Sequence, residues 1–489
     1  MSFNFTEHME QILQQIPALL VIIPLITSAV IMLIPNIRLA KILFLMANFS
    51  VLIISAIGIC NIKNTIYYDF GNWGRVAGIE LKYDFLAAYS SFLLYFIFWI
   101  FSFFSIKSFS SKLDCFLDKK RVHTAYALFL VVQASYCGII ITNDIFNFYV
   151  FLEIASLASY PLIAIGQNPR RYIHAFEYLM IGTLAATAIL LSIGFIFSQV
   201  GSLNLEHVRE YFATNNSNLR IIISLFVAGI LVKLAVFPLH GWKLESYTST
   251  SIIVAGFFLA PSSITFINSL LKFRDFLRFD DIFFTESVLT ITSLGMITAA
   301  YYAFKQTDYL KLIILSSISS VGYYLMLWPY DSKDSIFLLV QLLNIDSLVK
   351  VGMIMVPLIF KENNITLSYL INLSKQKRAI AIILAILFLH SAALPPTIYF
   401  FNKVRILVYL ASSENKFIFI APVVIASLFT AIYSLNIARH MMQSSKIIKK
   451  FYIDYFVLSG VVSVIFCLII LLYKTNNFID LANKIYLGL

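Results

Sequence analysis

An acidic side chain stands in the middle of one long apolar stretch of this sequence. Residues 143–166 read NDIFNFYVFLEIASLASYPLIAIG and contain Glu153 near their centre. Because an ionisable group at bilayer depth is costly, such groups usually face a protein or water-filled interior and mark ion or proton pathways. The alternative is a carboxyl group that burial keeps neutral, or one that only pins two helices together. We expect Glu153 to be functional and look for its partner in the rest of the chain.

Two lysines lie in apolar stretches that proline interrupts. Lys233 occurs in LFVAGILVKLAVFPLHGW, where Pro238 removes a backbone donor and should break or kink the helix. Lys403 ends the stretch LHSAALPPTIYFFNK, which contains Pro395 and Pro396. Two proline-interrupted spans set five helices apart are typical of a repeated or inverted transporter unit. A structural role for Lys233, and snorkelling of Lys403 from a helix end to the interface, stay open as alternatives.

A carboxylate and a lysine stand one helical turn apart in a further apolar stretch. Asp346 precedes Lys350 by four residues in FLLVQLLNIDSLVKVGMIMVPLIF, so both side chains share one helix face. An opposite charge this close favours the charged form of each group and opposes the effect of burial. The pair could be a static structural ion pair, or a proton-accepting site whose affinity depends on the approach of a third charge.

Four further ionisable residues are secondary candidates for proton transfer. His240 ends the seventh predicted span and His390 lies in the twelfth, and histidine titrates near neutrality. A lone histidine near a helix break is more often a packed or capping residue, so we rank both below the lysines. Asp84 and Glu177 lie near the starts of the third and sixth spans and could equally sit at the membrane interface.

The sequence predicts neither a catalytic site nor a bound cofactor. Its 4 cysteines are scattered, with no CxxC and no Cys/His cluster that would ligate a metal or an iron–sulfur centre. It also contains neither a dinucleotide-binding GxGxxG nor a P-loop. The N-terminus, MSFNFTEHMEQ, is acidic rather than basic and is not predicted to be a cleaved signal peptide.

Composition and apolar run length predict an all-α polytopic membrane protein. Hydrophobic residues make up 60% of the 489 residues and charged residues 12%, about half the charged fraction of a soluble domain. Apolar runs close to the ~20 residues that a spanning helix needs recur along the whole chain. We predict about fourteen spans. Their bounds are near 16–35, 40–61, 84–106, 122–142, 145–167, 174–200, 219–240, 248–271, 284–304, 308–328, 335–360, 379–402, 417–438 and 454–473.

Basic residues concentrate in the loops on one side of the predicted bundle. The net charge of +11 could suggest nucleic acid, but Lys and Arg occupy short loops between spans, so we expect no nucleic acid partner. The richer set of loops, which includes Lys243, should be cytoplasmic, and the poorer set, which includes Lys272, should face outward. Both termini would then lie on the periplasmic side of a bacterial inner membrane.

Several of these stretches, taken in order, carry a family resemblance. They are DIFNFYVFLEIASLASYPLIAIG, NPRRYIHAFEYLM, VKLAVFPLHGW, QTDYLKLIILSSISSVGYYLM, SLVKVGM and ALPPTIYFFNK, with GIELKYDFL as a weaker match. In order and spacing they resemble the antiporter-type subunits of respiratory complex I, and most of all the D subunit of the Mrp multisubunit cation/proton antiporters. The resemblance covers roughly residues 75–410.

The resemblance implies a specific architecture. It implies fourteen helices with two inverted five-helix repeats, each containing one broken helix, and a row of buried charges along the membrane midplane. It divides the chain into helices 1–3 (1–110), a first repeat (111–275), a second repeat (276–440), and a last helix with its tail (441–489). The family residues along which protons move would correspond to Glu153, Lys233, Lys350 and Lys403.

The resemblance also implies an activity. It is that of a proton-translocating subunit of a monovalent cation (Na⁺)/proton antiporter of the Mrp D type, working with other membrane subunits. The alternative is a proton-pumping subunit of NADH-quinone oxidoreductase (complex I) or of a related membrane hydrogenase. A non-transporting scaffold, whose charges only pin helices together, is an alternative of another class. For transport, Glu153 and Lys233 would form a switchable ion pair, which Asp346 with Lys350 and then Lys403 would extend.

The chain departs from the family pattern at two intermediate positions and in one loop. Ala260 stands about where Mrp-type relatives commonly carry a lysine, and Asp346 replaces the histidine usual four residues before Lys350. The segment KLESYTSTS replaces a proline-rich run. The end charges of the row are thus present, while the connection between its two halves is altered.

Overall fold

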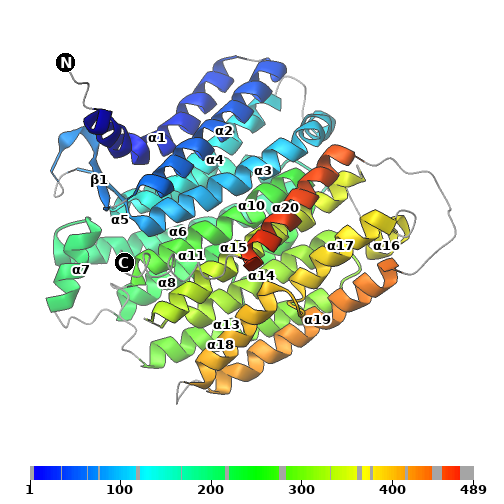
Figure 1. Cartoon of the computed structure of the whole chain (residues 1–489). Coiled ribbons are helices and arrows are strands. Elements are labelled where there is room, and N and C mark those ends of the chain that lie inside the picture. Colours follow the sequence, from blue (N-terminus) through cyan, green and yellow to red (C-terminus); the bar gives the residue numbers. More distant parts are fainter. Residues whose placement is uncertain are drawn as a thin grey trace.

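The computed structural model is almost entirely helical, as predicted (Figure 1). In lipid every backbone N–H and C=O group needs an internal partner, which a continuous helix supplies. The chain's first and last residues, which were predicted to face the periplasm, lie outside the described residues. Loop residues such as Lys120 and Lys449 do so as well. The structure describes residues 5–34, 36–62, 64–74, 78–116, 122–166, 168–214, 220–274, 282–330, 332–360, 366–374, 378–412, 417–442 and 454–473.

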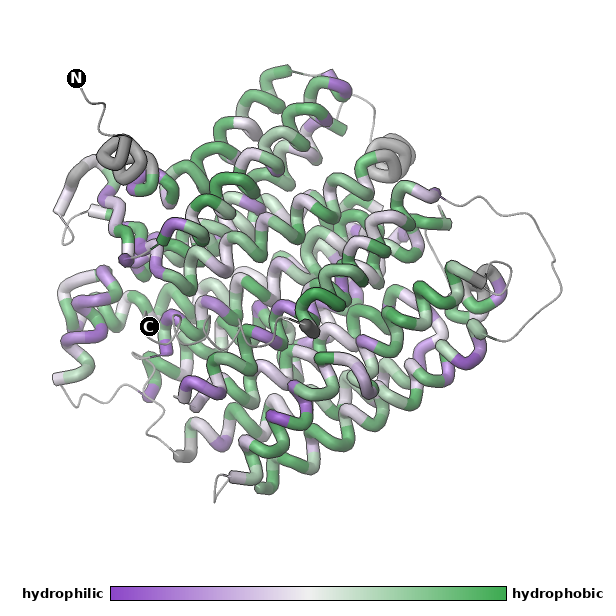
Figure 2. Tube along the Cα trace, in the orientation of Figure 1, coloured by the Kyte–Doolittle hydropathy of each residue, from purple (hydrophilic) through white to green (hydrophobic). Residues whose placement is uncertain are grey.

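Within these ranges, 11 helical segments are long and apolar enough to cross a membrane. Hydrophobic residues cover most of their length (Figure 2). One segment consists of two helices, α10 and α11, because Pro261 stands at the first position of α11 and cannot continue the backbone hydrogen bonding of α10. The segments are α1 (Phe5–Leu33), α2 (Ile37–Asn61), α3 (Phe85–Phe116), α4 (Val122–Ile141), α5 (Ile145–Ile163), α6 (Arg171–Val200), α10 (Ile252–Leu259) with α11 (Pro261–Lys272), α13 (Ile282–Lys305), α14 (Tyr309–Leu327), α15 (Lys333–Ile359) and α19 (Ile420–Met442).

Three shorter apolar segments complete the predicted fourteen within the described residues. The seventh span consists of α8 (Arg220–Lys233) and α9 (Gly241–Ser249), and the twelfth of α17 (Arg378–Ser391) and α18 (Ile398–Ala411). The last is α20 (Tyr455–Tyr473). The seventh and twelfth are the two spans for which proline predicted a break.

The two breaks have the same backbone design. Each contains an alanine in the left-handed region, Ala235 at φ 59° and Ala393 at φ 52°, three residues before a proline whose peptide bond is cis. After each alanine, a backbone N–H reaches five residues back, from Val236 to the Leu231 carbonyl at 3.0 Å and from Leu394 to Leu389 at 3.3 Å. Such a shared irregularity agrees with two repeats that each hold one broken helix.

The breaks also correct two predicted positions. Helix α8 ends at Lys233, well before Pro238, so Lys233 occupies the C-terminal end of a helix rather than its interior. The twelfth span does not end at residue 402, because α18 continues to Ala411. Lys403 therefore lies inside a helix rather than at a helix end.

The centre of the molecule is formed by helices from both halves. Helix α15 is buried along its whole apolar length, as is the α10–α11 pair. Helix α15 packs against α3, α14, α18 and α20 (Figure 1). Helix α9 packs against α14. Charged residues on these inner helices are consequently shielded from lipid.

Short helices and strands lie at both ends of the bundle. Strands β1 (Ile66–Asp69) and β2 (Glu80–Tyr83) pair antiparallel, with Ile66 opposite Tyr83, and flank the short helix η1 (Phe70–Asn72). They lie at the same end of the bundle as the amphipathic α7 (Leu205–Thr214), opposite the end that carries α16 (Leu367–Ser374) (Figure 1). A second short helix, η3 (Phe417–Phe419), precedes α19. None of these elements was predicted, because each is much shorter than the apolar run of a membrane span.

Candidate functional site

Lys233 is a buried cation at the break of the seventh span. Its side chain is 9% exposed, and its Nζ donates a hydrogen bond to Ser156 Oγ of α5 at 2.8 Å. Gly182 of α6 lies beside it: a Cβ there would make ordinary contact with Nζ, at 3.5 Å, but would approach Tyr160 Oη to 2.8 Å. At the end of α8 the ammonium also lies near the negative end of the helix dipole. Three helices thus hold this lysine.

Glu153 lies one helical turn before Ser156 on α5 and is half-buried. Its charge acts on Lys233, but among the described side chains the two do not form an ion pair within 4.0 Å. Instead Ser156 accepts the lysine hydrogen bond. The structure therefore brings Glu153 and Lys233 into electrostatic range while keeping them apart, and the switchable ion pair stays a prediction.

Asp346 and Lys350 form the predicted ion pair one turn apart on α15. They are 5% and 3% exposed. Asp346 also accepts hydrogen bonds from two side chains of α14, Ser320 Oγ at 2.9 Å and Tyr324 Oη. Hydrogen bonds to an ionised group are stronger than neutral ones. The carboxylate is therefore held by one ion pair and two hydrogen bonds.

Lys403 of α18 is enclosed by aromatic rings. It is 5% exposed, and its Nζ lies 4.4 Å from the ring centroid of Tyr323 on α14 and 5.0 Å from that of Tyr399. Both distances are within the range of a cation–π interaction. The charge of Asp346 also acts on it. Burial on this scale excludes the snorkelling interpretation.

Two lysines that the sequence placed in loops belong to helices and are buried, so both loop predictions were wrong. Lys243 is 1% exposed and lies in α9, because the seventh span resumes after its break and continues to Ser249. Lys272 is 9% exposed, and its Nζ donates to the carbonyls of Ile140, at 3.3 Å, and Thr142 at the end of α4. Lys243 was assigned to a loop because the segment after the break is polar. Predicting its burial would have required a helix that continues past residue 240.

The secondary candidates occupy different environments. His240 is half-buried at the start of α9, with its ring 5.9 Å from that of Phe237. His390 Nδ1 lies 2.9 Å from the Ile386 carbonyl of its own helix. Glu177 is exposed, and its Oε2 lies 3.0 Å from His174 Nδ1. The two histidines thus lie beside the breaks, whereas Glu177 is on the outer surface of α6.

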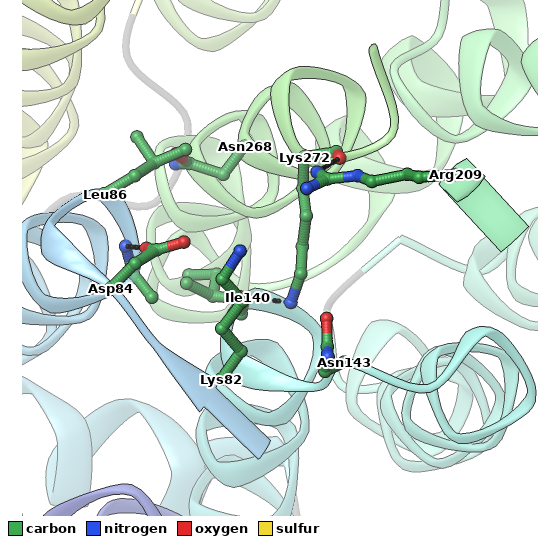
Figure 3. A pocket seen from close by; sticks show the side chains of 9 residues that line it. Lys82, Asp84, Leu86, Ile140, Asn143, Arg209, Asn268 and Lys272 are labelled. Carbon is green, nitrogen blue, oxygen red and sulfur yellow. Dashed lines mark hydrogen bonds between the residues drawn. The ribbon is translucent and has the colours of Figure 1, made fainter. Parts of the chain in front are cut away.

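Asp84 lies in a polar pocket at the end of the bundle that carries the β-hairpin (Figure 3). Its Oδ1 accepts from the Ala87 backbone N–H at 2.7 Å, so it caps α3. Arg209 Nη2 donates to the Lys272 carbonyl at 2.7 Å, at the end of α11. The charges of this pocket therefore also close helix ends. Its lining residues are Lys82, Asp84, Leu86, Ala87, Ile140, Asn143, Arg209, Asn268 and Lys272. Elsewhere, no three His, Cys, Asp or Glu side chains of the described residues are grouped to hold a metal ion.

Two curated relatives resemble parts of this chain. The N subunit of NADH-quinone oxidoreductase from Desulforudis audaxviator is 31% identical over 323 residues, 64% of this chain and 64% of that protein. The D subunit of the Na(+)/H(+) antiporter from Alkalihalophilus pseudofirmus is 25% identical over 261 residues, 53% of this chain and 52% of that protein. The chain thus spans between about half and two-thirds of the length of these relatives.

Two solved structures share the fold. They are a chain of the membrane-bound sulfane sulfur reductase, an archaeal respiratory membrane complex, and a chain of the Mrp complex from Dietzia sp.. Both have a TM-score of 0.86 and cover 97% of this chain and 97% of their own, at 20% and 16% identity. The predicted fold is thereby confirmed.

The family resemblance is confirmed as well, although the relatives bear the names of both kinds of assembly. The family model described as NADH:quinone oxidoreductase/Mrp antiporter, TM matches residues 142–430, more than half of the chain. This range includes Glu153, Lys233, the Asp346–Lys350 pair and Lys403. The chain belongs to the NADH:quinone oxidoreductase/Mrp antiporter transmembrane family.

Proposed function

We propose that this chain is the proton-translocating membrane subunit of a multisubunit monovalent cation (Na⁺)/proton antiporter of the Mrp D type. The observation that carries this proposal is a series of buried charges at Lys233, the Asp346–Lys350 pair and Lys403. Each is engaged by a polar or aromatic side chain of another helix. Buried ionisable groups inside membrane spans mark proton pathways.

The mechanism uses the separation of Glu153 from Lys233. When the carboxylate approaches the ammonium, the lysine holds its proton; when the two separate, burial favours the neutral amine and the proton leaves. Ser156, which accepts from Lys233 in this structure, keeps the lysine in place while Glu153 is apart. Proton release at one half then changes the field felt by the Asp346–Lys350 pair and by Lys403.

Other membrane subunits are the proposed partners, with protons and Na⁺ as the transported ions. Glu153 is half-buried in the isolated chain, and a carboxylate facing lipid at this depth would be costly. Apolar side chains on the neighbouring α6 are exposed, among them Phe176 at 61% and Leu184 at 67%. We place a companion subunit over this surface, in a bacterial inner membrane whose cytoplasmic side carries the richer set of basic loops.

A complex I-type assembly is the second candidate, and the 31% identity to an NADH-quinone oxidoreductase subunit favours it. The two assemblies differ in their soluble partners. Co-purification followed by mass spectrometry separates them, because iron–sulfur and flavin subunits would accompany only a respiratory complex. Co-purification of small Mrp-type membrane subunits would instead support the antiporter.

Transport by the reconstituted complex tests the proposal. The purified complex is placed in liposomes with an enclosed pH dye, and cation-dependent proton movement is followed. Glu153→Gln and Lys233→Ala should abolish it, whereas Arg405→Gln should not, because Arg405 is exposed and packs on Phe337. Undiminished movement in either of the first two variants would refute the assignment. Lys350→Met separates transport from scaffolding: a complex that still assembles but no longer moves protons argues against a scaffold role for this chain.

A further inference from the structure

Lys243 is a buried lysine to which the proposed proton path gives no role. It lies in the first turn of α9, directly after the break of the seventh span, and is 1% exposed. Its Nζ lies 5.8 Å from the centroid of the Tyr247 ring one turn later. Among the described side chains, no carboxylate comes within 4.0 Å of it. A buried ammonium without such a partner is costly, which favours a group that changes its protonation state.

The helix that carries Lys243 connects the two halves of the molecule. Helix α9 packs against α5 and α6 of the first half and against α14 of the second. Helix α14 supplies Ser320 and Tyr324, the two hydroxyl donors to Asp346. A displacement of α9 is therefore transmitted by direct packing to the helix that holds the Asp346 carboxylate.

The charges that act on Lys243 are those of the second half. They are Lys350 and Asp346 of α15, a helix that packs against α14, as α9 does. A protonated Lys243 repels the Lys350 ammonium and attracts the Asp346 carboxylate, so both interactions weaken the ion pair. A neutral Lys243 exerts neither force and leaves the pair closed.

Two of the segments beside α9, helix α6 and the α10–α11 segment, offer no substitute for Lys243. The α10–α11 segment packs beside α9 and α15, yet residues 252–271 contain no Asp, Glu, Lys, Arg or His. On α6, His174 Nδ1 lies 3.0 Å from Glu177 Oε2, and His174 Nε2 lies 4.0 Å from Glu245 Oε2. Tyr178 Oη accepts a hydrogen bond from Ser159 Oγ at 3.2 Å. These titratable groups of α6 are thus engaged with other partners.

We propose that Lys243 is the third charge that opens and closes the Asp346–Lys350 ion pair, and so couples the two halves of the proton path. This role rests on the proton-translocating function proposed above. Proton binding to the Lys243 amine opens the pair, and proton release closes it. Lys243 thereby supplies, from the broken seventh span, the ionisable link that the eighth span lacks.

Two opposite substitutions test this role in the reconstituted complex. Lys243→Met removes the charge, whereas Lys243→Arg makes it permanent because a guanidinium does not deprotonate in proteins. Each freezes the pair in one state, so each should slow cation-dependent proton movement about ten-fold or more, within the usual range of coupling between sites. Lys305→Met is the matched control: Lys305 also lies over a tyrosine ring one turn away, 4.4 Å from Tyr301, but is exposed.

The outcomes separate this proposal from the function on which it rests. Support requires slow transport by both Lys243 variants, wild-type transport by Lys305→Met, and unchanged co-purification with partner subunits. Wild-type transport by Lys243→Arg or Lys243→Met overturns the role of Lys243 but leaves the function intact. A wild-type complex that moves no protons overturns both. If Lys243→Met does not assemble, Lys243→Gln takes its place, and with Asp346→Asn its effect should be non-additive, because both act through one ion pair.

Discussion

Truncating Asp346 to alanine should destabilise the protein strongly, because it leaves a lysine buried without its counter-charge. The carboxylate is 5% exposed, forms an ion pair with Lys350 and accepts hydrogen bonds from Ser320 and Tyr324. Removing one partner of a buried ion pair costs about 3–5 kcal/mol, since the remaining charge stays out of water. Asp346→Ala should therefore lower the free energy of unfolding by about that amount.

Removing both charges should restore most of this loss. Replacing a buried ion pair by apolar side chains of similar volume is often neutral or stabilising. In Asp346→Leu/Lys350→Met, Ser320 Oγ keeps an acceptor, the Ser316 carbonyl at 2.9 Å. Tyr324 loses its acceptor, and an unsatisfied buried hydroxyl costs about 1–3 kcal/mol. The double variant should thus be about 1–3 kcal/mol less stable than wild type, and more stable than Asp346→Ala.

Unfolding in mixed micelles with a rising fraction of SDS measures this difference, with helicity as the signal. The order expected is wild type, then the double variant, then Asp346→Ala. If Asp346→Ala unfolds at the same SDS fraction as wild type, the pair is solvated and the reasoning from burial fails. If the double variant is no more stable than Asp346→Ala, the penalty does not come from the orphaned Lys350 charge.

Three further substitutions probe other parts of the site. Gly182→Ala should lower stability by about 1–3 kcal/mol in SDS unfolding, because the new Cβ would lie 2.8 Å from Tyr160 Oη. Tyr323→Leu should cost up to about 2 kcal/mol in the same assay, since it removes the ring 4.4 Å from Lys403 Nζ. Asp144 is the N-cap of α5, where its Oδ1 accepts from the Asn147 N–H at 2.6 Å. Burial raises the pKa of Asp144, so its stabilisation is full at low pH and is lost as the pH rises through this raised pKa. Asp144→Asn should flatten that part of the pH profile of unfolding while still capping α5.

The spans could be predicted from the sequence because their signal is local. An apolar run of suitable length needs no knowledge of its neighbours, and a proline inside one indicates a break. The position of the break could not be predicted the same way. Helix α8 ends at Lys233 because Ala235 adopts a left-handed conformation. Alanine rarely adopts this conformation, so the residue type does not predict it. The β-hairpin was missed because strands of 4 residues leave no periodic pattern.

The candidate site was predictable where its charges interrupt apolar runs. Lys233, Lys350 and Lys403 stand among hydrophobic residues and attract notice for that reason. Lys243 stands in the polar segment KLESYTSTS, which has the composition of a loop. Its burial comes from the packing of α9 between α6 and α14, a tertiary contact that no local pattern encodes. Asp84 was found, but its pocket depends on residues from four separate parts of the chain.

The two halves repeat a backbone design without repeating its charges. Lys233 stands two residues before the left-handed Ala235, and the residue in the same place before Ala393 is Ser391. The Ser391 hydroxyl donates to the Phe388 carbonyl at 2.8 Å, within its own helix. The second half therefore has no lysine in the last turn of the helix that precedes its break, where His390 stands instead.

Its lysine is instead placed in the helix that follows the break. Lys403 lies ten residues after Ala393, where the first half has the exposed Glu245 ten residues after Ala235. At the end of α8, the helix dipole favours a cation, whereas inside α18 that contribution is absent and tyrosine rings surround the ammonium instead. A change in the backbone of the first break must act directly on Lys233. A change in the second reaches Lys403 only by moving α18 as a body, so the two breaks control their lysines by different means.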